Sequence, residues 1–281
     1  KSAIKVVIPK GKTGALFKWV ALLTGSKNAL KGLGFFLGGV LLNWLEFDGA
    51  LIVMAVVLSI ILFLTVCNLP GSLGQVNKQT KFEQILSKSS DINWLSGARF
   101  FLFGSRDIWF VVGLPLFLAG TMNWNHQEVG TYMAIWIIAY GFIQALAPKI
   151  LNQFGKKPEP KLSRFWISAL LLITLSIIVS IQLGTSPNFI IIFGLLLFGF
   201  AFAVNSAIHS YLVLAYSKAE NVSLNVGFYY MANAGGRLIG TFLSGILYQW
   251  GGLVLCLILS SIFLLVSWSL SLALPNLIKE L

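Results

Sequence analysis

Long apolar runs constrain this chain more than any other feature. Residues 51–66 and 253–274 carry no charge and are apolar on every face. A helix needs about 20 such residues to cross a bilayer, whereas a transmembrane β-strand needs about 10 with strict alternation. With 57% of residues hydrophobic and 10% charged, the composition also lies outside the soluble range. The sequence therefore predicts an all-α integral membrane protein, and it excludes soluble enzymes, nucleic-acid modules and secreted disulfide scaffolds.

The runs divide the chain into eight predicted transmembrane helices. We expect spans at residues 16–44, 50–68, 94–120, 127–148, 165–184, 188–216, 222–247 and 252–274. The longest polar connection separates two helices from six. We therefore predict the end of an N-terminal helical bundle at 1–68, a cytoplasmic loop between bundles at 69–93, and a six-helix C-terminal bundle at 94–281. The second and eighth spans, which have no charge, are expected to face lipid.

Basic residues alternate between the connections. Fifteen of the twenty Lys and Arg residues fall in residues 1–18, 69–93, 149–164, 217–221 and 275–281, and the intervening loops carry none. Basic residues near helix ends stay in the cytoplasm. Both ends of the chain are therefore predicted to be cytoplasmic, and the net charge of +11 mostly reflects topology and headgroup contact rather than a nucleic-acid partner.

A repeat relates the first and seventh spans. A shift of 206 residues lays residues 31–44 (KGLGFFLGGVLLNW) over residues 237–250 (RLIGTFLSGILYQW), with six identities in fourteen positions. Each copy carries small residues four apart that permit close helix contacts: Gly34 and Gly38, and Gly236, Gly240 and Ser244. Both copies run from inside to outside, as in transporters made of two six-helix halves. If the seventh span is the fifth of its half, four helices are expected to precede this chain.

This arrangement resembles the major facilitator superfamily, whose halves carry a basic loop signature after their second helix. Residues 148–157 (PKILNQFGKK) match it with Gly155, Lys156 and Lys157, whereas Asn152 stands where the acid would be. The strings at 25–39, 98–118 and 225–252 are similar to the facilitator-type permeases of bacterial arsenic-resistance operons, the ArsJ family. That resemblance implies export of 1-arseno-3-phosphoglycerate across the bacterial inner membrane. It also implies a glyceraldehyde-3-phosphate dehydrogenase as the partner that makes this ester.

Charged residues inside the spans are the candidate site. The predicted spans contain one carboxylate, Asp107, and five cations at comparable depth: Lys27, Lys31, Arg99, Arg106 and Arg237. An unpaired charge at the bilayer centre costs at least about 2.5 to 3.5 kcal/mol. Arginine forks and ammonium groups suit phosphate-like oxyanions. The surplus of positive charge therefore predicts a cavity for a multiply charged anion.

Several interpretations of these residues remain open. Arg99 could snorkel to the cytoplasmic surface, and Asp107 could be a charge partner or a proton-coupling group. The predicted substrate-binding set combines four cations with neutral hydrogen-bonding groups at helical spacing: Arg106, Arg237, Lys31, Lys27, Asn205, His209, Tyr230 and Asn233.

No catalytic residues, cofactor or metal are predicted. Cys67 and Cys256 lie near opposite ends of their spans, so no thiol cluster exists for trivalent arsenic. His126 and Glu128 share a loop without cysteine. Two alternatives to arsenate ester export stay open. One is a facilitator for another organic phosphate, carboxylate or drug-like anion, and the other is a membrane-embedded enzyme or lipid-handling protein.

Overall fold

The computed structural model describes residues 13–68, 89–184, 187–218 and 221–276, and in this part of the chain helices are joined by short turns and irregular connections. The helices are α2 (Thr13–Asn68), α3 (Ser90–Phe110), α4 (Gly113–Gly120), α5 (His126–Gln153), α6 (Pro160–Gln182), α7 (Pro187–Ala215) and α8 (Val222–Leu272). The predicted all-α membrane architecture is confirmed. Residues 1–12, 69–88 and 277–281, which include much of the predicted loop between bundles, lie outside the described residues.

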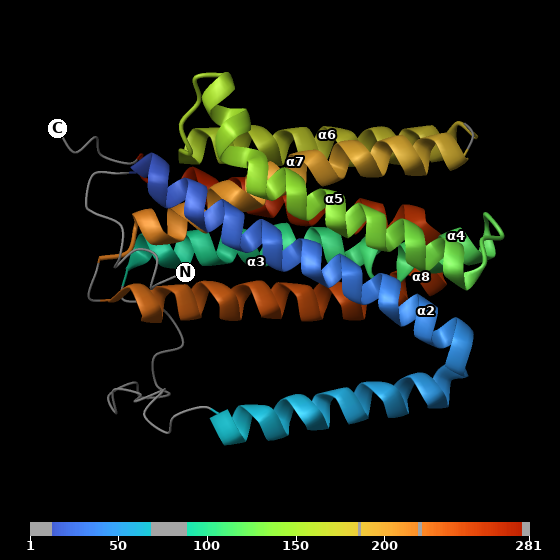
Figure 1. Ribbon diagram of the computed structural model, residues 1–281. Coiled ribbons are helices and arrows are strands. Elements are labelled where there is room, and N and C mark those ends of the chain that lie inside the picture. Colours follow the sequence, from blue (N-terminus) through green and yellow to red (C-terminus); the bar gives the residue numbers. More distant parts are fainter. Residues whose placement is uncertain (1–12, 69–88, 185–186, 219–220, 277–281) are drawn as a thin grey trace.

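Two of the helical segments contain a bend with non-helical φ and ψ, so each consists of two helices that the sequence predicted as separate spans. Six described helical segments are long and apolar enough to span a membrane. Two of these, α2 and α8, have 56 and 51 residues, and each bends back on itself so that it crosses twice (Figure 1). A straight helix of 51 residues would be roughly 77 Å long, far more than the 30 Å hydrocarbon layer. The third predicted span is divided in two, since α3 ends at Phe110 and α4 begins at Gly113.

The two bends occur at repeat-equivalent positions. Helix α2 bends at Glu46, with φ 56° and ψ −171°, and α8 bends at Gly252, with φ 62° and ψ −159°. These residues are 206 positions apart, which is the shift that aligns the sequence repeat. The backbone therefore repeats where the sequence repeats, although only one copy has glycine at the position with positive φ.

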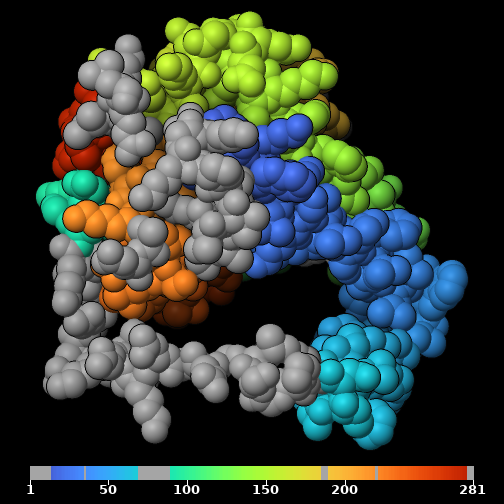
Figure 2. Space-filling model, turned by 60° about the vertical axis from the view of Figure 1, so that its left-hand side comes forward, coloured from blue at the N-terminus to red at the C-terminus, as the bar shows by residue number. Residues whose placement is uncertain are grey.

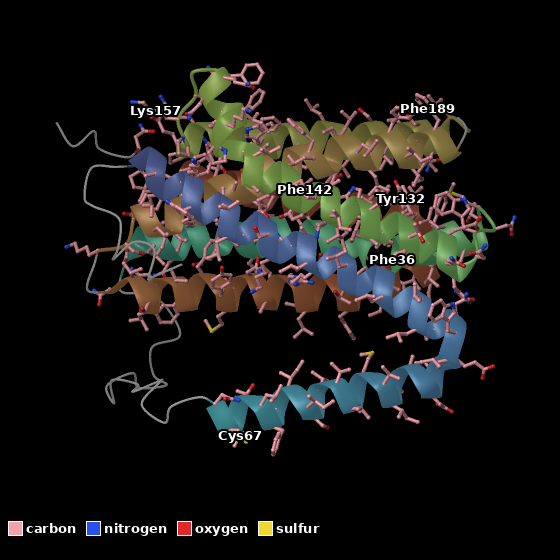
Figure 3. The ribbon with its side chains drawn as sticks, viewed as in Figure 1. Phe36, Cys67, Tyr132, Phe142, Lys157 and Phe189 are labelled. Carbon is pink, nitrogen blue, oxygen red and sulfur yellow. The ribbon has the colours of Figure 1, made fainter. Side chains whose placement is uncertain are left out.

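The basic connections lie at one end of the bundle. In Figure 1 the start of α2, the connection between α5 and α6 and the start of α8 lie together on the left, and the bends of α2 and α8 lie on the right. Figure 3 places Lys157 and Cys67 toward the first end and Phe189 toward the second. The chain thus has the alternating topology that the charge pattern predicts.

Helix packing is extensive for all elements except the second half of α2. The first half of α2 packs along α5, while α3 packs along α8 and α6 packs against α7 and α8. Beyond the bend, the residues of α2 are almost all exposed, and this segment stands apart from the bundle (Figure 2). It fits the expectation of a lipid-facing span. The second half of α8 does so only in part, because one of its faces is buried, including Cys256, Ser260 and Ser267.

The bend of α2 predicts a stabilising substitution. Backbone with φ near +60° and ψ near 180° is populated essentially by glycine alone, and other residues pay about 1–3 kcal/mol there. Glu46→Gly should therefore raise the thermal unfolding midpoint of the purified protein in detergent. The matched change Gly252→Ala should lower it. A lower midpoint for Glu46→Gly would mean that contacts of the Glu46 side chain, rather than backbone strain, decide the stability of the bend.

Candidate anion-binding site

Glycines bring α3 and α8 into close contact around the site. A Cβ atom on Gly236 would collide with the carbonyl oxygen of Phe100, and one on Gly240 would lie 2.7 Å from the carbonyl oxygen of Gly104. The predicted close contact is thus present in this copy of the repeat. It is absent at Gly34 and Gly38, where a Cβ would meet nothing within 4 Å.

The other copy uses different small residues. On α2, Gly25 and Gly32 contact α5, where a Cβ atom on Gly141 would lie 2.5 Å from the backbone nitrogen of Ala29. The two halves of the repeat therefore pack against their neighbours at different points along the helix. The close crossing of α3 and α8 is what allows their long side chains to meet.

Asp107 is the centre of a three-residue ion cluster. It is fully buried, and both of its carboxylate oxygens accept hydrogen bonds from arginine. The Nε atom of Arg106 donates to Oδ1 at 2.7 Å, and the Nε atom of Arg237 donates to Oδ2 at 2.7 Å. This geometry supports the charge-partner interpretation of Asp107. Two guanidinium groups share one carboxylate, so the cluster keeps a net charge of +1.

Arg237 is the accessible member of this cluster. Its side chain is 42% exposed, compared with 12% for Arg106. Only its Nε atom bonds Asp107. Its terminal nitrogens make no hydrogen bond within the described part of the chain, so they can donate to a ligand.

The lysines of α2 add positive charge near this cluster. Lys27 and Lys31 are both exposed, one helical turn apart. Lys31 experiences repulsion from Arg237, Lys27 and Arg106, and attraction from Asp107. Cations that are far apart in the sequence are therefore brought together from α2, α3 and α8, as the charge surplus predicted.

Arg99 is buried rather than snorkelling. Its residue exposure is 3%, which excludes the interpretation that its guanidinium reaches the membrane surface. Nε donates to Oδ1 of Asn233 at 3.0 Å, and Nη1 donates to Oγ of Ser206 at 3.2 Å. The same Ser206 oxygen accepts from Nε2 of Gln144 at 3.0 Å, and Gln144 accepts from Nδ2 of Asn28 at 2.6 Å. This polar chain links α8, α3, α7, α5 and α2.

The neutral residues of the predicted set are divided between exposed positions on α8 and the bundle interior. Tyr230 is 37% exposed, and Asn233 is partly exposed on the same side of α8 as Arg237. Asn205 and His209 are fully buried in α7. Asn205 accepts a hydrogen bond from Ser163 of α6 at 2.8 Å, and the ring nitrogens of His209 have no partner among the described residues.

Sequence reasoning missed three members of the polar chain and one ring. Asn28, Gln144 and Ser206 are neutral polar residues within long apolar segments, and listing every amide in a span would have found the first two. Phe103 was not predicted as a functional residue, because nothing distinguishes it from the other phenylalanines of a Phe-rich sequence. Yet its ring lies under two guanidinium groups, with Cζ of Arg99 at 3.7 Å and Cζ of Arg106 at 5.0 Å from the ring centre.

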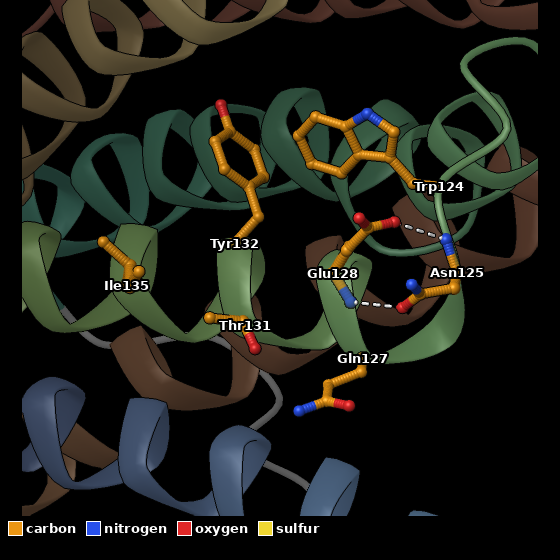
Figure 4. A pocket seen from close by; sticks show the side chains of 7 residues that line it. All are labelled: Trp124, Asn125, Gln127, Glu128, Thr131, Tyr132 and Ile135. Atoms are coloured by element: carbon orange, nitrogen blue, oxygen red, sulfur yellow. Dashed lines mark hydrogen bonds between the residues drawn. The ribbon is translucent and has the colours of Figure 1, made fainter.

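A recess at the start of α5 is a different kind of surface. Its lining, shown in Figure 4, is Trp124, Asn125, Gln127, Glu128, Thr131, Tyr132 and Ile135. Asn125 and Glu128 bond each other's backbone nitrogens there, at 2.9 and 2.8 Å, which caps the helix. None of the lining residues is basic, so this recess does not suit an anion.

Soft-metal chemistry has little support in the described residues. Cys67 and Cys256 are both free, and no group of three His, Cys, Asp or Glu side chains in this part of the chain is arranged to hold a metal ion. The ligand chemistry on offer is that of guanidinium, ammonium, hydroxyl and amide donors.

A helical bundle of repeated bent helices, with a cationic cluster inside the membrane, defines a multi-pass membrane transporter. Residues 95–277 match the sequence profile of the Major Facilitator Superfamily. The chain belongs to this superfamily, whose members are transporters. No curated protein and no solved structure matches it.

The shared carboxylate predicts a rescue between two substitutions. Asp107→Asn should lower the thermal midpoint in detergent strongly, because removing one partner of a buried ion pair costs about 3–5 kcal/mol. Adding Arg237→Gln should restore part of the loss, because it removes one of the two uncompensated cations. If the double variant loses the sum of the two single effects, Asp107 and Arg237 do not stabilise each other.

Proposed function

We propose that this transporter exports an organic arsenate ester, 1-arseno-3-phosphoglycerate, from the cytoplasm and thereby confers resistance to arsenate. The observation that supports the proposal most is the intramembrane cluster of Arg106, Arg237 and Lys31 around the single carboxylate of Asp107. Such a surplus of positive charge is costly in a membrane unless an anion balances it. Arsenate and phosphate esters present the oxygen atoms that guanidinium groups bind best.

Within this proposal, the residues have separate roles. Arg237 donates its terminal nitrogens to one oxyanion, and Lys31 and Lys27 add positive potential from α2. Arg106 is held by Asp107 behind Arg237, and Tyr230 and Asn233 supply neutral hydrogen bonds. Asn205 and His209, which are buried behind this surface, support the helices that carry it. A glyceraldehyde-3-phosphate dehydrogenase makes the substrate in the cytoplasm, without needing to touch the transporter.

The same proposal covers orientation and location. The protein is placed in the bacterial inner membrane, with the basic end of the bundle in the cytoplasm.

A second substrate class is served by the same cations. An organic phosphate or carboxylate without arsenic would bind the cluster by the same donors. The assay for the arsenate ester separates these possibilities, because only the ester requires the dehydrogenase.

Labelling of single cysteines tests the orientation. In a background with Cys67→Ser and Cys256→Ser, we expect Lys156→Cys to react only with membrane-permeant maleimide in intact cells. Asn123→Cys, in the connection between α4 and α5, should react with an impermeant maleimide as well. Both positions reacting from the same side would contradict the alternating topology, and the reverse pattern would contradict the cytoplasmic basic end.

Uptake into inverted membrane vesicles tests the substrate and the site. Supplied with arsenate, glyceraldehyde 3-phosphate, nicotinamide cofactor and the dehydrogenase, vesicles with the protein should accumulate arsenic. Arg237→Gln should lose about 1.5–3 kcal/mol of binding, roughly 10- to 150-fold in affinity. Arg237→Lys should recover only part of this, because the charge remains without the fork.

The matched control for charge is Lys161→Gln at the exposed start of α6, which should leave uptake unchanged. Normal expression with unchanged uptake in Arg106→Gln and Arg237→Gln would remove the proposed site. Accumulation of arsenate without the dehydrogenase would remove the proposed substrate.

A further inference from the structure

Arg99 is a buried cation without a carboxylate partner. Its residue is 3% exposed, and no Asp or Glu oxygen lies within 4 Å of it in the described residues, where the ion pairs belong to Arg106 and Arg237. Its partners are the neutral oxygens of Asn233 and Ser206 and the rings of Phe103 and Tyr229. A buried charge of this kind is expensive, because neutral groups replace only part of its hydration.

Arg99 is also close to the site described above. Its guanidinium carbon lies 3.7 Å from the centre of the Phe103 ring, and that of Arg106 lies 5.0 Å from the same centre. The two guanidinium groups can therefore be no farther apart than these two distances combined. Arg106 shares the carboxylate of Asp107 with Arg237, whereas Arg99 has no carboxylate partner among the described residues.

Asn233 occupies the place that an anion would take on Arg99. Its amide oxygen accepts from Nε at 3.0 Å. Asn233 is only partly buried, and it lies one turn from Arg237 on α8. An oxyanion that reaches Arg237 is therefore one helical turn from the Arg99 side chain, with a neutral amide as the group to displace.

We propose that Arg99 binds a second anionic group of the substrate, while Arg237 and Lys31 bind the first. The inference rests on the proposed function, since it assumes an anionic substrate at Arg237. The substrate class is then a short molecule with two separate anionic groups, and not a single inorganic oxyanion. Asn233 holds Arg99 when the second group is absent and releases it when that group arrives.

A pair of probes that differ in one anionic group tests the inference. Glycerol 3-phosphate carries a phosphate alone, and 3-phosphoglycerate carries the same phosphate with a carboxylate at the other end. We expect the wild-type protein in detergent to bind 3-phosphoglycerate at least about tenfold more tightly by titration calorimetry, as a charge-assisted hydrogen bond would give. Arg99→Gln should bind the two probes equally, at the wild-type affinity for glycerol 3-phosphate.

The controls distinguish a ligand role from a structural one. Arg99→Lys should retain part of the preference, and Lys161→Gln, an exposed change at the start of α6, should retain all of it. If Arg99→Gln weakens both probes by the same factor, Arg99 acts only through the helix contacts that it makes, and the inference is overturned. Equal affinity of the wild-type protein for the two probes would also overturn the inference. This measurement needs no variant, so the inference can be tested even if Arg99→Gln does not fold.

Different outcomes of the same titrations would contradict the proposed function rather than the role of Arg99. If wild-type protein binds neither probe, or if Arg237→Gln leaves both affinities unchanged, the anion site itself is wrong. If the wild-type protein binds both probes equally, and Arg237→Gln abolishes the binding of both, the proposed anion site is supported. Only the proposed role of Arg99 is then contradicted.

Discussion

The desolvation of charge inside a bilayer is the constraint on which the rest of this structure depends. Asp107 is fully buried, and both of its carboxylate oxygens accept hydrogen bonds from guanidinium groups, which offset the cost of burying the charge. That geometry requires α3 and α8 to approach so closely that Gly104, Gly236 and Gly240 have no room for a side chain. The close packing of α3 and α8 is therefore a condition for the ion cluster of the site to form.

The sequence predicted most of the fold, because its strongest signals are physical requirements of the membrane. Apolar length identified the crossings, and the alternation of basic loops identified which ends lie together. The repeat identified the relation between α2 and α8, and their bends at Glu46 and Gly252 follow it. The predicted boundaries at residues 44–50 and 247–252 fall at these bends, where the backbone leaves helical φ and ψ. The break between α3 and α4 was missed, because the predicted apolar span at 94–120 continues across it.

The candidate site was predicted less completely. Charge in an apolar context is rare and easily seen, so Lys31, Arg106, Asp107 and Arg237 were found. Three members of the polar chain that includes Arg99 were not, since Asn28, Gln144 and Ser206 are neutral and come from three other helices. The sequence gives no indication of which face of α7 carries Ser206 toward α3, and the burial of Asn205 and His209 could not be told from exposure to a cavity. Such details depend on how the helices are rotated in the bundle.

The polar chain from Asn28 to Asn233 has a consequence for movement. Four of its members belong to α3, α5, α7 and α8, whereas Asn28 alone belongs to α2. Within this polar chain, a rotation of α2 against the other helices would therefore break only the hydrogen bond between Asn28 and Gln144. The hydrogen bonds that Arg99 makes would stay intact. In a low-dielectric interior an unpaired buried amide is costly. Such a rotation would therefore require new hydrogen-bond partners for the amide nitrogen of Asn28 and the amide oxygen of Gln144.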